Sequence, residues 1–449
     1  MFGSLAPLSK LFIEQNYMKY KSISNDIAII AILALSMAIG SYLLFNWLND
    51  QMQNTLIWVN DRWFDSDIYR IYYVMTDRLS LEHERSSTHP LFSIIAYPTM
   101  QAMTSILGIG PPRALKLLVA ISAALWLGCI YTTIRLIGCK KFDATIFSVL
   151  AASSASSIFW FAVPETFASG SISILVSLAF IAFTRFRKIN WIWYIPLNIF
   201  TLSFTITNWM AGIIITYIKL SFRKFIITLA LTLIIVFCLW LFQATLFPAV
   251  HQLIPTEGGN ILTAQAGGVL NSLKAVLAHS MIAPTLLLRP DMSVGSSLLI
   301  LSFQGAKLGS GSVWGAIALI PWAFLLCLGV RSFFIANIDP SFRLALVIIL
   351  VGQVLLHLIY GFEAFLYSLH FLPLIIIFAS LTTLTRYRKI ALTLALLVIP
   401  LAFMNNGVQF KKSGICLGKL RLQKALSEDE QKMLKHSPMG FDSKYRCGI

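Results

Sequence analysis

The stretch IAIIAILALSMAIGSYLLFNWL, residues 27–48, decides the fold because it runs for 22 residues without a charged side chain. A helix of about 20 apolar residues is long enough to cross the hydrocarbon core of a bilayer. Lys10, Lys19 and Lys21 precede the stretch. Lysine and arginine mark the cytoplasmic flanks of membrane spans, so the N-terminus is predicted inside and the next loop outside.

The composition extends this prediction to the whole chain. Hydrophobic residues make up 57% of the sequence and charged residues 12%, against about 25% charged in ordinary soluble domains. The formal net charge of +16 would indicate nucleic acid in a soluble protein. Here the cations lie mostly in short loops between apolar runs, where they set topology and contact anionic lipid headgroups. No basic patch interleaved with aromatic residues is visible, so nucleic acid is not an expected partner.

Alternating apolar runs and basic loops predict an all-α polytopic membrane protein with about eleven transmembrane helices, N-terminus in and C-terminus out. The predicted spans are residues 27–48, 114–136, 144–163, 169–184, 191–208, 209–220, 225–247, 313–330, 344–360, 368–384 and 390–404. Residues 91–108 are apolar but short and contain Pro98, so we expect a juxtamembrane helix that lies along the external face.

These spans divide the chain into a transmembrane domain at residues 1–404 and a small tail at 405–449. The domain includes a first external loop at 49–113 and a long external loop at 248–312. The tail is expected outside, although its many lysines would also fit a cytoplasmic location. If it is outside, Cys416 and Cys447 can form a disulfide. Ser427 and Glu430 have the spacing of a capping box that opens a short helix.

The first external loop holds the densest group of polar residues, DSDIYRIYYVMTDRLSLEHERSSTHPLFSII at residues 65–95. Asp65 and Asp67 lie two residues apart. Such a pair can chelate a divalent cation or supply a general base. The alternative is that Asp65 or Ser66 caps a helix beginning near Ile68. Asp67 and Asp65 are thus the candidate catalytic residues, and a divalent cation is the candidate cofactor.

The same loop offers further candidate binding residues. His89 precedes Pro90, and could bind phosphate or orient an acid, or could be a surface residue at a helix start. Arg70 and Arg85 are candidate cations for a phosphate group. The other polar residues of the loop, Glu82, His83 and Glu84, are expected to be solvated.

Later external segments add candidates on the same predicted face. Glu165 lies in the short PETF turn at residues 164–167. A carboxylate between two spans is costly unless it is paired or hydrated, so it is either functional or an interfacial residue. Lys274, Arg289 and Lys307 in the long loop suit a lipid phosphate, or else anchor headgroups.

Tyr367 and His370 are further candidate substrate-binding residues at the entrance of a later span, where aromatic-belt residues are also common. Span interiors hold few charges, which argues against an ion-coupled transporter. Walker A, GxSxG and HExxH motifs are absent from the sequence.

An N-in first span, an external loop with an early Asp, the segment THPLFSI at residues 88–94 and the PETF turn together resemble the GT-C superfamily of polytopic glycosyltransferases. This superfamily includes protein mannosyltransferases and lipid A aminoarabinose transferases. The resemblance implies transfer of a sugar from a polyprenyl-phosphate donor to a glycan, lipid or protein acceptor outside the membrane, with inversion at the anomeric carbon. It gives the role of the base to Asp67 or Asp65. The chain departs from the family pattern in having Asp-Ser-Asp where an Asp-Glu pair is usual.

Two other functions stay open. An O-antigen ligase or polymerase would use a late external loop, where this chain has Arg289, His251 and His279. A lipid or solute transporter is the second, although the charge-poor spans disfavour it. The expected location is the plasma (inner) membrane of a bacterium, among membrane lipids.

Overall fold

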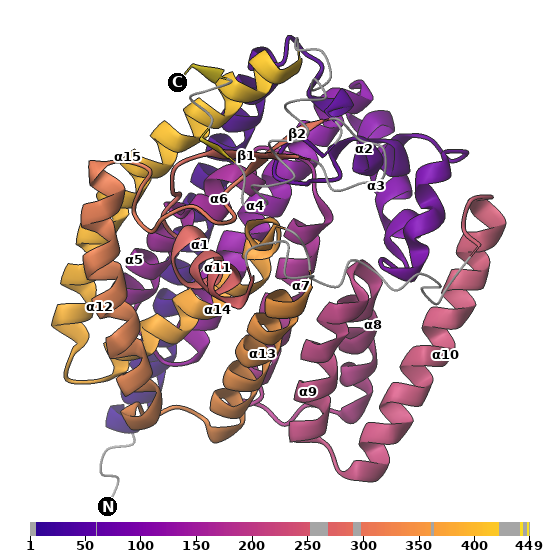
Figure 1. Cartoon of the computed structure of the whole chain (residues 1–449). Coiled ribbons are helices and arrows are strands. Elements are labelled where there is room, and N and C mark those ends of the chain that lie inside the picture. Colours follow the sequence, from indigo (N-terminus) through magenta and orange to yellow (C-terminus); the bar gives the residue numbers. More distant parts are fainter. Residues whose placement is uncertain are drawn as a thin grey trace, which may run out of the picture.

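A computed structural model describes residues 6–59, 61–251, 268–290, 298–360, 363–421, 441–442 and 447–448. Within these residues the chain is a bundle of helices, and eight of the helices are long and apolar enough to cross a membrane. Figure 1 shows the long helices side by side, with the small sheet at one end of the bundle. The prediction of an all-α, multi-pass membrane protein is therefore confirmed.

The eight long helices alternate with shorter ones. The eight are α1 (Ala6–Gln51), α4 (Pro111–Leu136), α7 (Thr166–Phe183), α10 (Phe222–Leu246), α12 (Val313–Ile335), α13 (Pro340–Ile359), α14 (Ser368–Ser380) with η7 (Ala364–Tyr367) and η8 (Leu381–Leu384), and α15 (Arg388–Arg421). The predicted spans at 144–163, 191–208 and 209–220 are instead made of shorter helices. These are α5 (Lys141–Ala152), α6 (Ala155–Trp160), η3 (Trp191–Trp193), α8 (Tyr194–Phe204), η4 (Ile206–Asn208) and α9 (Trp209–Lys219).

Short polar residues fix where several helices begin. The Ser154 hydroxyl accepts the Ser157 amide at the start of α6, and Ser312 does the same for Gly315 in α12. Asp339 accepts the Phe342 amide at the start of α13, where proline occupies the first helical position. These caps satisfy amide groups that have no partner within the helix.

The elements that do not span are shorter, and Figure 1 shows the sheet with some of them toward one end of the bundle. They are η1 (Leu56–Trp58), α2 (Ile68–Thr76), η2 (Leu81–Ser87), α3 (Phe92–Leu107), α11 (Gly268–Lys274), the π-helical turn η6 (Ala275–His279), and strands β1 (Leu287–Pro290), β2 (Leu299–Ser302) and β3 (Phe441–Asp442). Strand β1 is central and pairs antiparallel with β2 and β3. The sequence prediction did not include this sheet.

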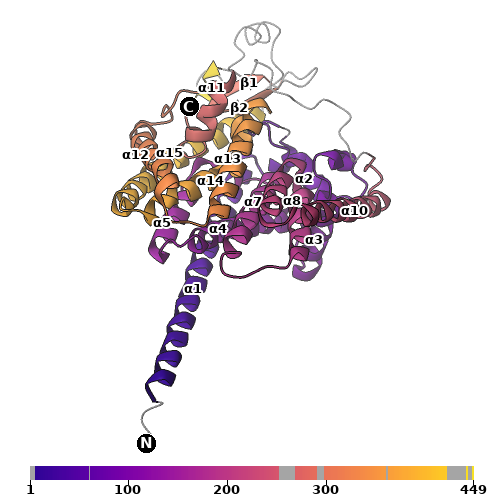
Figure 2. The same ribbon diagram turned by 90° about the horizontal axis from the view of Figure 1, so that it is seen from below.

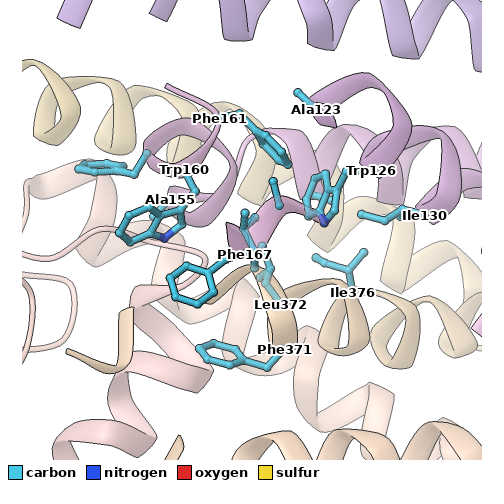
Figure 3. Packing of buried hydrophobic residues seen from close by; sticks show 14 of the residues in the cluster. Ala123, Trp126, Ile130, Ala155, Trp160, Phe161, Phe167, Phe371, Leu372 and Ile376 are labelled. Carbon is cyan, nitrogen blue, oxygen red and sulfur yellow. The ribbon is translucent and has the colours of Figure 1, made fainter. Parts of the chain in front are cut away.

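Interlocking apolar side chains hold the centre of the bundle. Figure 3 shows Trp126 of α4, Trp160 of α6, Phe167 of α7 and Leu372 of α14 within one packed cluster. The N-terminal part of α1 instead extends away from the other helices (Figure 2). The core therefore lies within the bundle formed by the later spans and the C-terminal part of α1.

The C-terminal region differs from its prediction. Helix α15 continues past residue 404 to Arg421, so the predicted tail begins inside a helix. Cys416 and Cys447 form the predicted disulfide, with their Cα atoms 5.0 Å apart. The predicted capping box at Ser427 and Glu430 lies outside the described residues. The N-terminus and the C-terminus lie at opposite ends of the bundle (Figure 1).

Candidate functional site

The backbone before α2 adopts a conformation that L-residues rarely take. Phe64 and Asp65 have φ angles of 53° and 67°, in the left-handed region, which costs about 1–3 kcal/mol per residue. The Phe64 ring offsets this cost because it is fully buried and contacts Phe159 and Phe303, with ring centroids 5.5 and 4.7 Å away. The aromatic core thereby fixes the backbone that presents Asp65 and Asp67.

Asp67 lies between two guanidinium groups. Its carboxylate contacts Arg70 Nη2 at 2.5 Å and Arg85 Nη1 at 3.1 Å. Asp67 stands at the N-cap position of α2, but its carboxylate makes no capping hydrogen bond to a described residue. The alternative that Asp65 or Ser66 caps this helix is wrong, since the helix begins at Ile68 with Asp67 before it. Arg70, which follows within the first turn, takes the carboxylate instead.

Glu165 joins the PETF turn to this pair. Its Oε2 atom accepts the Asp67 amide at 3.0 Å, while Oε1 accepts the amide and the hydroxyl of Thr166, both at 3.2 Å. Glu165 is thus the N-cap of α7, and it is buried rather than facing headgroups.

Burial and nearby charge move the pKa values of these two carboxyls in opposite directions. Burial alone would raise the pKa of Asp67, but the guanidinium groups of Arg70 and Arg85 outweigh it and lower this pKa. Burial, and next the charge of Asp67, raise the pKa of Glu165. The Asp67 carboxylate is therefore held ionised, whereas Glu165 readily keeps a proton.

A second arginine-centred unit comes from the sheet and the turn before η7. Arg289 Nη2 on β1 lies 3.0 Å from Asp65 Oδ2, and Arg289 Nε lies 4.0 Å from Glu363 Oε2. The Ser302 hydroxyl on β2 donates to the same Glu363 oxygen at 2.5 Å. Burial raises the pKa of Glu363 to about 7 despite the nearby charge of Arg289. We refer to Asp65, Asp67, Glu165 and Glu363 with Arg70, Arg85 and Arg289 as the carboxylate site.

His89 is buried beside the carboxylate site and is not the surface residue of the alternative interpretation. Its Nδ1 atom lies 2.6 Å from the carbonyl oxygen of Phe204, which can only accept, so Nδ1 carries the proton and Nε2 is an acceptor in the neutral ring. Burial, and next the charge of Arg70, lower the pKa of His89 to about 3. The segment around it is fastened by Gln243, whose side chain donates to the Pro90 carbonyl. A substrate contact by His89 stays a prediction, and it would be made by a neutral imidazole.

The remaining predicted binding residues divide between the carboxylate site and other places. Tyr367 lies beside the site, because its ring packs edge-on against Phe167, two residues after Glu165, with centroids 5.0 Å apart. His370 is buried one turn further along the chain, with its ring against Phe167.

The two lysines of the long loop are not part of the carboxylate site. Lys274 ends α11 and makes no ion pair with a described residue. Lys307 is exposed.

The structure gives Glu363 and His83 different surroundings from those expected from the sequence. Glu363 was not ranked as a candidate, although it carries the signal that marked Glu165, a carboxylate in a short turn between apolar spans. His83 was expected in a solvated loop, but it is buried. Its two ring nitrogens contact the Ser93 hydroxyl and the Asp77 carbonyl, at 2.8 and 2.9 Å.

The geometry does not favour a shared cation between Asp65 and Asp67. Each carboxylate faces a different arginine, Arg289 for the first and Arg70 with Arg85 for the second. Among the described residues no group of three or more His, Cys, Asp or Glu side chains could hold a metal ion. The donor set thus does not fit the divalent cation considered from the sequence, and no step is assigned to one.

What the arrangement offers is a set of ionised and protonated carboxyls, three arginines and a tyrosine at one end of a membrane bundle. Carboxyls with different pKa values in one site can divide the roles of acid and base. Arginines in such a place bind phosphate or carboxylate groups of a ligand. Compared with protein-family models, with curated proteins and with solved structures, the chain matches none of them.

Proposed function

We propose that this chain is a GT-C-type glycosyltransferase, which moves a sugar from a polyprenyl-phosphate donor to an acceptor outside the plasma (inner) membrane of a bacterium. The proposal includes eleven membrane crossings. Eight are the long helices, and three are added by shorter helices: α5 with α6 as one crossing, α8 as the second and α9 as the third. The observation that carries it is the carboxylate site. Four segments far apart in sequence contribute to it, namely the first loop, the PETF turn, strand β1 and the turn before η7.

The reaction needs a base for the acceptor hydroxyl. The acceptor oxygen attacks the anomeric carbon of the sugar, the bond from that carbon to the phosphate oxygen breaks, and the polyprenyl phosphate leaves with the electron pair. A carboxylate takes the hydroxyl proton. General-base catalysis of this kind accelerates a reaction by about 10²–10⁴-fold.

Asp65 is the better of the two candidate bases. Asp67 binds two arginines and has a lowered pKa, which makes it a weak proton acceptor. Asp65 faces the buried Arg289, and its backbone is in the left-handed region. Strained residues of this kind often occur at functional sites. Asp67 then acts as a positioning residue, which orders Arg70 and Arg85 and is itself held by Glu165.

The leaving phosphate needs positive charge rather than a proton. The Arg85 side chain is 54% exposed, so its guanidinium is accessible to a phosphate bound at the protein surface. Arg289 is buried and can follow the phosphate only by exchanging its pairing with Asp65. This exchange would take the charge of Arg289 away from Asp65 and so raise the affinity of Asp65 for the proton when the donor is bound.

The test is transfer of radiolabelled sugar from polyprenyl-phosphate donors by the purified chain in nanodiscs. Asp65→Asn should abolish transfer while the protein stays folded, and Asp67→Asn should weaken it. Full activity in both variants would overturn the assignment. A lipid-linked oligosaccharide as the only accepted donor would indicate the ligase or polymerase, and flux into liposomes without product would indicate the transporter.

Loss of activity in Arg289→Ala does not separate the glycosyltransferase from the ligase. Arg289 pairs with Asp65, so both functions depend on it. The identity of the donor therefore decides between them. The lipid species that accumulates when the protein is deleted gives the same answer in cells.

A further inference from the structure

A group of polar side chains lies inside the helical bundle next to the carboxylate site. It consists of Asn208 at the end of η4, Gln353 and His357 on α13, and His370 on α14. All four are at most 2% exposed. None of them takes part in the reaction proposed above.

These side chains lack the partners that buried polar groups require. Asn208 Nδ2, Gln353 Oε1 and both ring nitrogens of His357 and of His370 have no hydrogen-bond partner among the described residues. One weak contact exists within the group, from Gln353 Nε2 to Asn208 Oδ1 at 3.4 Å. Each buried unpaired group costs about 1–3 kcal/mol, and polar groups within a membrane bundle are commonly functional.

The group is compact and touches the carboxylate site. A Cβ atom on Gly170 of α7 would lie 2.6 Å from Asn208 Nδ2 and 2.7 Å from His370 Nε2. The His357 ring stacks on Tyr367, with centroids 4.5 Å apart and planes at 15°. The Tyr367 ring packs in turn against Phe167, two residues after Glu165 of the carboxylate site, with centroids 5.0 Å apart. The polar group therefore begins where the carboxylate site ends.

The chemistry of the free atoms defines the ligand that would satisfy them. An amide nitrogen donates, an amide oxygen accepts, and each neutral imidazole offers one donor and one acceptor. None of the four side chains carries a fixed charge or joins an ion pair of the described residues, so the group itself gives an ionic ligand no counter-charge. Hydroxyl groups, which donate and accept at once, match this mixture.

We propose that Asn208, Gln353, His357 and His370 bind an uncharged polyhydroxyl ring. This inference rests on the proposed function and narrows its substrate class to neutral sugars. The ring can belong to the polyprenyl-phosphate donor or to a sugar acceptor. The two sources share their hydroxyl chemistry, and the experiment separates them by the Michaelis constant that changes.

The first arm compares two donors that differ in one group. Polyprenyl-phosphate glucose and polyprenyl-phosphate glucuronic acid share their ring, but the second carries a carboxylate. The full chain in nanodiscs should use the glucose donor with a kcat/KM higher by about tenfold or more, since 1.4 kcal/mol corresponds to a factor of ten. Equal use of both donors, or preference for the glucuronic acid donor, would overturn the inference.

The second arm removes polar atoms at nearly constant shape. Gln353→Met replaces an amide with an unpaired oxygen and one weak contact by an apolar side chain of similar length, so a purely structural cluster predicts a nearly unchanged Tm and unchanged kinetics. A ligand site predicts a KM higher by about tenfold with little loss of kcat. An increase in the donor KM assigns the ring to the donor, and an increase in the acceptor KM assigns it to the acceptor. Unchanged KM values for both substrates would contradict the inference.

The third arm fills the site without removing a polar group. Gly170→Ala places a methyl group against Asn208 and His370, and should raise the same KM as Gln353→Met. The matched control is Gly407→Ala on α15, where a Cβ meets no atom within 4 Å, and it should leave the kinetics unchanged. Equal effects of the two alanine variants would contradict a site at Gly170.

Thermal shift gives a readout that does not depend on transfer. Polyprenyl-phosphate glucose should raise the Tm of the wild type, and raise it less in Gly170→Ala than in Gly407→Ala, because a ligand stabilises only the state that binds it. If transfer occurs but neither the KM nor this shift differs between variants, the inference fails and the proposed function stands. If the shift is present without transfer of any sugar, the proposed function fails and the polyol site stands.

Discussion

The two ends of the helical bundle use charged residues in different ways. At the end that holds the N-terminus (Figure 1), carboxylates and cations join one helix to another. Arg388 of α15 binds Asp143 of α5 through two contacts of 2.9 and 2.6 Å, and Arg135 of α4 contacts Asp26 of α1 at 2.8 Å. Each of these carboxylates joins two neighbouring helices.

At the end that holds the sheet, the charges converge instead. Arg289 is shared by Asp65 and Glu363, and Asp67 is shared by Arg70 and Arg85. Two of the carboxyls there, Glu165 and Glu363, have raised pKa values because burial disfavours their charge. Ion pairs that connect helices can be explained by stability, whereas buried carboxyls with shifted pKa values indicate function.

The largest expected effect comes from replacing one carboxylate by an amide at each end of the bundle, in two separate variants. Asp65→Asn removes the candidate base and should lower kcat by about a thousandfold, and its Tm should also fall because the buried Arg289 loses a partner. Asp143→Asn removes a buried partner of Arg388 and should lower Tm, because breaking a buried pair leaves a charge uncompensated. Its kcat should equal that of the wild type. Transfer assays and thermal unfolding of both variants check the comparison, and a large loss of kcat in Asp143→Asn would break it.

The next effect is a pH dependence that belongs to the sheet end. The pKa of Glu363 rises from the ordinary 4.5 to about 7 in the folded chain. Between these values the folded state holds a proton that the unfolded state has released, so stability falls as pH rises through the window and levels off above pH 7. The pKa difference corresponds to roughly 3 kcal/mol. Glu165 adds to the fall in the same direction.

Glu363→Gln should remove much of this pH dependence because the amide does not ionise. Tm measured between about pH 5 and pH 8 should fall less in the variant than in the wild type. The lowered pKa of Asp67 acts in the opposite sense, since its stabilisation is lost only as pH falls below the ordinary carboxyl range. Identical slopes for the variant and the wild type would show that Glu363 is not the titrating group.

Much of the fold was predictable because apolar length and the placement of lysine and arginine are local properties of the sequence. Glu165 was found in the same way, as a carboxylate between two spans. The continuation of α15 beyond residue 404 was not predicted, because Asn405 and Asn406 look like the polar edge of a span. In the structure both are buried, and Asn406 donates to the carbonyl oxygens of Ser153 and Met281.

The pairing within the carboxylate site could not be read from the sequence. Arg289 and Asp65 are far apart along the chain, and only the packing of the sheet against the first loop brings them to 3.0 Å. His83 shows the opposite case. Its polar neighbours in sequence indicate solvent, but its ring packs on Phe247 with centroids 4.4 Å apart.

A smaller effect is expected from the disulfide that only the sheet end carries. Cys416 and Cys447 link α15 to the chain just after β3, and β3 pairs with β1, the strand of Arg289. Replacing both cysteines by serine should lower stability by about 2 kcal/mol, since the cross-link restricts the unfolded chain. Reductant should lower the Tm of the wild type but not that of the variant. The control is Cys238→Ser with Cys327→Ser, two exposed free thiols whose loss should leave Tm unchanged.

The smallest effect tests whether exposed cations at the two ends differ. The Arg85 side chain is 54% exposed and pairs with Asp67, so Arg85→Gln should change stability by less than about 1 kcal/mol. It should nevertheless raise the donor KM by roughly threefold, because a guanidinium near the leaving phosphate contributes binding. Lys219 at the other end pairs with Asp339 at 3.9 Å, and Lys219→Gln should change neither Tm nor KM measurably.

High salt should weaken donor binding in the wild type more than in Arg85→Gln, since screening acts on the exposed charge that the variant lacks. Equal salt dependence in both would place the phosphate elsewhere, at Arg70 or Arg289, whose burial shields them from salt.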